Sequence, residues 1–157
     1  MDYLEPSALS ISPRDGSVYL RGANELLRRD TPKTFVATRL APLIHRSINH
    51  QNGYEWIWLG HLTFAGLPCG LGLCFYAEEL SELSFGVSLP APELIDGWPN
   101  RATSEREIEF VREELKTQMN RSFDSGVEQF GWGSVWCLFD ERGQQASSGL
   151  RYGDRRS

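Results

Sequence analysis

The sequence has few of the residues that build metal centres or disulfide frameworks. Its 157 residues include three cysteines and three histidines. The histidines are scattered, and Cys69 and Cys74 have no second Cys or His pair near them. Because a structural zinc site uses closely spaced Cys and His pairs, we expect no metal. An odd number of cysteines among apolar neighbours favours reduced, buried thiols.

Long apolar runs are also missing. No stretch approaches the roughly 18 apolar residues that a membrane-spanning helix needs. The opening MDYLEPSALS lacks the basic and apolar regions of a secretory signal. These absences predict a cytoplasmic protein that does not contact membranes. The length and a hydrophobic content of 40% predict one domain over residues 1–157, with 153–157 as a frayed tail.

Positive charge is scarce in the second half of the chain. Residues 1–78 hold 7 acidic and 7 basic side chains, whereas residues 79–157 hold 14 acidic and 9 basic ones. An acidic surface repels nucleic acid phosphates and attracts basic proteins. The sequence therefore predicts no binding to nucleic acid. Surface charge that keeps the protein soluble is the other explanation.

No pattern in the sequence predicts a catalytic residue or a bound cofactor. The glycines of AGLPCGLG (65–72) precede an expected strand, whereas a phosphate-binding loop precedes a helix. Cys69, in a bend near His61, is the more exposed candidate nucleophile. Cys137 lies inside an expected strand and is interpreted as a core residue. We therefore expect a protein that is not an enzyme.

Alternating apolar residues predict an α+β fold built on an antiparallel sheet of about five to seven strands. A hairpin is expected over 8–22, a three-stranded meander from residue 54, and a second hairpin over 130–152. The first strand of the last hairpin is apolar on both faces, which places Trp136 and Cys137 in a central strand.

In the first strand of the meander, the alternation assigns each side chain to a face. An uninterrupted period of two puts Trp58, Leu62 and Phe64 on one face. Ile57 and Leu59 then fall on the other face. The proline-rich segment 90–100, which follows the meander, is expected to be a loop.

The clearest helix is predicted over 103–123, packed on one face of the sheet. Ser104 and Glu107 match a capping box at its start. Its apolar stripe has helical spacing and consists of Ile108, Val111, Leu115 and Met119.

A shorter helix is expected after Thr31-Pro32, with Thr31 as N-cap. The spacing of Leu40, Leu43, Ile44 and Ile48 continues the helical pattern, and Pro42 interrupts it.

A protein-binding surface is predicted where acidic side chains gather near one tryptophan. It consists of Glu93, Asp96, Trp98, Glu105, Glu109 and Glu113. The last three glutamates recur every four residues, and like charges so spaced mildly destabilise a helix. Helix stability therefore does not explain them, whereas a basic partner would. Trp98 is the aromatic anchor of this predicted surface.

The order of motifs resembles small bacterial α+β immunity proteins. The resemblance covers Thr31-Pro32 with Phe35, the meander from residue 54, Trp98 before an acidic helix, and the ending WGSV…D…G…ASSGLRY. Such proteins bind polymorphic or type VI secreted toxins. The resemblance implies an inhibitor that blocks a toxin's active site or its access to substrate, without catalytic residues or cofactors. An acidic surface would suit a toxin with a basic cleft.

Two other classes of function stay open. One is a phage-type inhibitor of a bacterial defence system, or an adaptor in secretion. The other is an enzyme of unrecognised type, which would need a pocket with converging polar groups.

Overall fold

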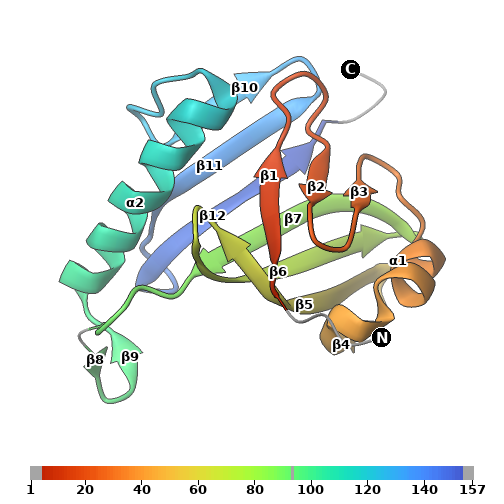
Figure 1. Cartoon of the computed structure of the whole chain (residues 1–157), viewed down its shortest axis with the longest axis horizontal. Coiled ribbons are helices and arrows are strands. Elements are labelled where there is room, and N and C mark those ends of the chain that lie inside the picture. The colour runs from red at the N-terminus through yellow and green to blue at the C-terminus, as the bar shows by residue number, and fades with distance from the viewer. Residues whose placement is uncertain (1–4, 93, 154–157) are drawn as a thin grey trace.

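The protein folds as a ten-stranded sheet with two helices, as seen in a computed structural model that describes residues 5–92 and 94–153 (Figure 1). The strands of this sheet are β1 (Ser7–Ile11), β2 (Val18–Leu20), β3 (Glu25–Leu27), β4 (Ile44–Asn49), β5 (Tyr54–Phe64), β6 (Leu67–Tyr76), β7 (Glu79–Val87), β10 (Val127–Phe130), β11 (Gly133–Asp140) and β12 (Gln145–Tyr152). The remaining elements are α1 (Lys33–Arg39), the 3₁₀ turn η1 (Ala41–Leu43), α2 (Arg101–Met119), and a separate hairpin of β8 (Leu94–Ile95) and β9 (Trp98–Pro99).

The strand order is β10-β11-β12-β7-β6-β5-β1-β2-β3. The far edge of β5 is shared, because β4 pairs with its first half and β1 with its second. The β1–β5 pairing is parallel and short, and the other pairings are antiparallel. The predicted α+β class, both hairpins and the meander are confirmed. The sheet has more strands than expected because β3, β4 and β10 lie in segments that show no alternation.

A bulge in β5 changes which side chains face the core. The pairing with β6 shifts between Leu59 and Leu62, and His61 there has a φ of 59°. One extra residue turns the following side chains to the opposite face. Leu62 and Phe64 are therefore buried on the same face as Leu59, and the prediction that they share a face with Trp58 is wrong.

The core lies between the sheet and the elements that cover one of its faces. Figure 1 shows α2 and the β1–β3 segment in front of the same side of the sheet. Helix α2 contacts β11, β12 and β1, and its predicted apolar stripe is confirmed, with Val111, Leu115 and Met119 buried. On the opposite face, Trp136 is only half-buried, although the apolar pattern of its strand predicted burial on both faces.

Helix α2 begins two residues earlier than predicted. The N-cap is Asn100, whose Oδ1 accepts a hydrogen bond from the Thr103 N–H at 2.8 Å. Ser104 is buried inside the first turns, and Glu107 Oε2 accepts from the Val87 N–H at 3.1 Å. The predicted capping box is therefore wrong, because α2 begins at Arg101 and the Glu107 N–H that Ser104 would have capped lies inside the helix, while Asn100 caps the Thr103 N–H.

The segment from Thr31 to Asn49 also differs from its prediction. Thr31 does not cap α1, since its Oγ1 accepts from the Arg28 N–H at 2.9 Å. Pro42 ends the helical region as expected, within η1. The residues after it form β4 and pair with β5. This pairing outweighs their helical spacing, because a helix there would bury little apolar surface.

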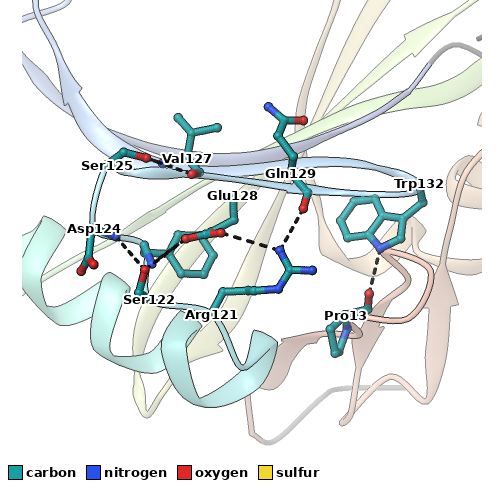
Figure 2. Close-up of polar contacts among 10 residues, drawn as sticks. Pro13, Arg121, Ser122, Asp124, Ser125, Val127, Glu128, Gln129 and Trp132 are labelled. Atoms are coloured by element: carbon teal, nitrogen blue, oxygen red, sulfur yellow. Dashed lines mark hydrogen bonds and ion pairs between the residues drawn. The ribbon is translucent and has the colours of Figure 1, made fainter.

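Polar contacts hold the end of α2 against the rest of the fold (Figure 2). Glu128 in β10 accepts from the Phe123 N–H at 2.9 Å and lies 3.7 Å from Arg121. The indole Nε1 of Trp132 donates to the Pro13 carbonyl at 2.9 Å, which joins the β10–β11 turn to the β1–β2 turn. These contacts tie the segment after α2 to β10 and the β10–β11 turn to the β1–β2 turn.

Candidate partner-binding surface

The segment 90–100, predicted as a loop, contains a two-stranded hairpin. Ile95 pairs with Trp98, and the turn residues Asp96 and Gly97 have φ values of 51° and 84°. Positive φ at both central residues is typical of the tight turns that join hairpin strands. Figure 1 shows the β8–β9 hairpin beyond the first turn of α2, apart from the main sheet.

This hairpin exposes three large apolar side chains. Leu94 is 52%, Ile95 64% and Trp98 69% exposed, which confirms the surface position expected for Trp98. Asp96 is exposed between them, and Glu93 lies outside the described residues. Exposed aromatic and aliphatic side chains that lie together are typical of protein-binding surfaces.

The predicted acidic side chains of α2 face solvent on one side of the helix. Glu105 forms an ion pair with Arg101 at 3.1 Å, and Glu113 forms one with Lys116 at 3.0 Å. Exposed pairs of this kind contribute about 0–1 kcal/mol. They can therefore be exchanged for ion pairs with a partner at little energetic cost.

The same side of α2 also carries positive charge. Arg101, Arg106 and Lys116 are exposed, so the surface is mixed rather than uniformly acidic. Glu109 makes no ion pair within residues 5–92 and 94–153. The hairpin and Glu105 lie at the N-terminal end of α2, and Glu109 and Glu113 follow along the helix. Their role in partner binding stays a prediction.

A polar pocket beside this surface was not predicted from the sequence. It has a volume of about 380 Å³, and Glu107, Ser104 and Pro99 are among its lining residues. Burial raises the pKa of Glu107, and the hydrogen bond from Val87 only partly offsets this. Extending the stripe of α2 back by one turn would have placed Ser104 and Glu107 on the buried side.

The cysteines do not have the surroundings of a nucleophile. All three are buried, including Cys69, which was interpreted as the more exposed candidate nucleophile. Burial raises the pKa of Cys69 to about 12, and it also raises the pKa of Cys74 and Cys137. A reactive cysteine needs a lowered pKa and solvent access. These thiols therefore give no support to a cysteine enzyme.

Within the described residues, no group of three or more His, Cys, Asp or Glu side chains could hold a metal ion. None of the helices there has the length and apolar character needed to cross a membrane.

We expect the native protein to resist alkylation at all three cysteines. Iodoacetamide at mildly alkaline pH should leave Cys69, Cys74 and Cys137 unmodified, because burial disfavours the thiolate and blocks access. Mass spectrometry should show complete labelling once the same sample is unfolded in urea. Rapid labelling of one cysteine in the folded protein would contradict this and would revive the enzyme alternative.

Comparison with protein-family models and with curated proteins gives no match. Among solved structures, the fold matches a chain of Rhs1-CT in complex with cognate immunity protein RhsI1. The TM-score is 0.52 and the sequence identity 11%, over 92% of this chain and 86% of that chain. Similarity at this identity establishes a shared fold. The resemblance to immunity proteins that the sequence indicated therefore has a structural counterpart, at the level of the fold.

Proposed function

We propose that this chain is a cytoplasmic, non-enzymatic immunity protein that neutralises a bacterial toxin by binding a basic cleft. The fold shared with a chain of a complex that contains an immunity protein carries this proposal, because the match extends over 92% of the chain. The exposed hairpin beside acidic side chains supports it, since tight protein complexes often centre on an aromatic anchor.

Binding alone would account for inhibition. The β8–β9 hairpin presents Trp98 as an apolar anchor, and Glu105, Glu109 and Glu113 continue along α2 as carboxylates for basic side chains. A protein held in this way over a cleft would exclude the toxin's substrate without any chemistry of its own. Buried cysteines with raised pKa values are compatible with such a passive role.

Capture of the partner from the native host tests the proposal. The tagged chain should retain a protein that stops bacterial growth when produced alone, and co-production of this chain should restore growth. A captured protein without toxicity would overturn the proposal. A component of a defence system or of a secretion machine would then indicate the corresponding alternative.

The acidic side of α2 is expected to speed association. Glu109→Lys with Glu113→Lys should lower the association rate with the captured toxin by about ten-fold at low salt. The difference should shrink as salt is added, because exposed charges are screened. Stopped-flow kinetics at several salt concentrations measures both effects.

A matched pair of substitutions controls for total charge. Glu78→Lys with Glu79→Lys changes the net charge equally, at the last residue of the β6–β7 turn and the first residue of β7, beside α1. This control should associate nearly as fast as the native protein. If the α2 variant folds and keeps both its on-rate and its salt dependence, the acidic surface is not the binding site.

A further inference from the structure

The pocket beside the hairpin opens where two neighbouring strands separate. The last residue pair between β12 and β7 at this end is Ser148 with Phe85. Beyond that pair, Gly86 carries no side chain, and a Cβ there would lie 3.8 Å from Glu107 Oε2. The gap leaves the Val87 N–H without a partner on β12, and Glu107 accepts its hydrogen bond instead.

Glu107 is the only ionisable residue among those that line this pocket in the described chain. Its Oε2 accepts from Val87, and it makes no ion pair within residues 5–92 and 94–153. Ser84, Ser88 and Ser104 supply hydroxyl groups around it. The pocket therefore combines one negative charge with several neutral hydrogen-bonding groups, which suits a single cation.

An indole ring forms part of the pocket wall. Trp58 lines the pocket, and its Nε1 is buried without a hydrogen-bond partner in the described part of the chain. The same ring holds the Arg46 guanidinium 5.6 Å from its centroid, so a cation is tolerated next to this indole. Pro99, which follows the exposed Trp98, lines the pocket too, so the pocket adjoins the hairpin.

Fold stability does not explain a carboxylate at this position. Burial raises the pKa of Glu107, which means that the folded state disfavours the ionised form. The favourable contribution of the protonated form is present in acid and is lost as the pH rises through the folded-state pKa. At neutral pH, Glu107 therefore lowers the stability, whereas a glutamine could accept the Val87 hydrogen bond without a charge.

We propose that this pocket receives one arginine side chain of the protein partner, whose guanidinium pairs with Glu107 while its stem lies against Trp58. The inference rests on the proposed function and adds a specific contact to it. Arginine is preferred over lysine because its planar fork can bond a carboxylate and neighbouring hydroxyl groups together. A desolvated pair of this kind acts mainly on dissociation, whereas exposed charges act on association.

Glu107→Gln tests the pocket through the dissociation rate. With the captured toxin, this variant should dissociate at least ten-fold faster, with little change in association rate or salt dependence. Glu114→Gln is the matched control, because Glu114 is half-buried on the same helix and accepts from Gln118 outside the pocket. An unchanged dissociation rate, in a complex that still depends on Glu109 and Glu113, would overturn the pocket and leave the proposed function standing.

Thermal melting separates a binding role from a structural one. Glu107→Gln should melt at a higher temperature than the native protein at neutral pH. The gap should close in acid, where Glu107 is protonated in both states. The ionisable groups that Glu107 influences are the buried thiols of Cys69 and Cys137, which stay protonated across this range. A lower melting temperature at neutral pH would show that the carboxylate serves the fold, against the inference.

A small cation tests the pocket without any partner. N-acetylargininamide should shift the NMR signal of the Trp58 indole N–H in the native protein and in Glu114→Gln, but not in Glu107→Gln. N-acetylglycinamide, which has no charged side chain, should leave it unchanged. If N-acetyllysinamide has an equal effect, the pocket accepts either cation, which would contradict the preference for arginine. Absence of any shift with N-acetylargininamide would count against the pocket.

Discussion

Replacing Gly149 with alanine is expected to destabilise the protein by about 3 kcal/mol, at the upper end of the usual effect of overpacking. Gly149 lies in β12, and a Cβ there would collide with the carbonyl oxygen of Leu83 and with the ring of Trp136. The indole could relieve the collision only by moving away from the sheet. The Leu83 carbonyl oxygen cannot move easily, because it belongs to the adjacent strand β7. Urea denaturation followed by circular dichroism measures the loss.

Gly70→Ala is the matched control for this prediction. Gly70 lies in β6, and no atom lies within 4 Å of the Cβ that alanine would add. A change of about 0.5 kcal/mol or less is expected there. Equal losses of stability in the two variants would contradict the close packing of Trp136 over Gly149.

Trp98→Ala is expected to weaken binding to the captured toxin by about 2–4 kcal/mol, which corresponds to roughly 30-fold to 1000-fold in Kd. The side chain is 69% exposed, so its removal should change the stability of the free protein by about 0.5 kcal/mol or less. Isothermal titration calorimetry and thermal melting on the same variant separate the two quantities.

Tyr76→Ala provides the comparison for an aromatic residue elsewhere on the surface. Tyr76 is 51% exposed at the end of β6, next to the start of β7, whereas the hairpin follows the other end of β7, and Tyr76 packs against Tyr54. Its loss should leave the Kd nearly unchanged. If Tyr76→Ala weakens binding and Trp98→Ala does not, the partner binds around Tyr54 and Tyr76 instead of the hairpin.

Local patterns predict the elements whose own residues determine them. The apolar stripe through Val111 and Leu115 identifies α2, because the 3.6-residue spacing of a helix is visible within its own sequence. The bulge at His61 was not predictable, because a left-handed backbone at a non-glycine residue leaves no local pattern. Strand β4 depends on β5 for its existence, so its helical spacing was misleading.

At the candidate surface, too, some features follow from the local sequence and others depend on contacts with distant segments. Prolines around Trp98 predict an exposed segment, and the exposure is observed. Ser104 and Glu107 satisfy a sequence motif for helix capping, but Asn100 takes that role. The actual partner of Glu107 is the Val87 N–H, 20 residues away in sequence. This N–H has no partner on β12, because β7 and β12 separate there. A motif within one helix contains no information about that separation.

The pairing of β7 with β12 has a consequence for the order of folding. The strands β5, β6 and β7 follow one another in sequence, as do β10, β11 and β12, so each group can form from short-range contacts. The two groups are joined through β7 and β12, where contacting residues such as Ser84 and Ser148 are 64 positions apart. Contacts at this separation form slowly because a long loop must close first. Since the Glu107 pocket lies at the end of this junction, we expect it to form only in that slow step, after the strands within each group have paired.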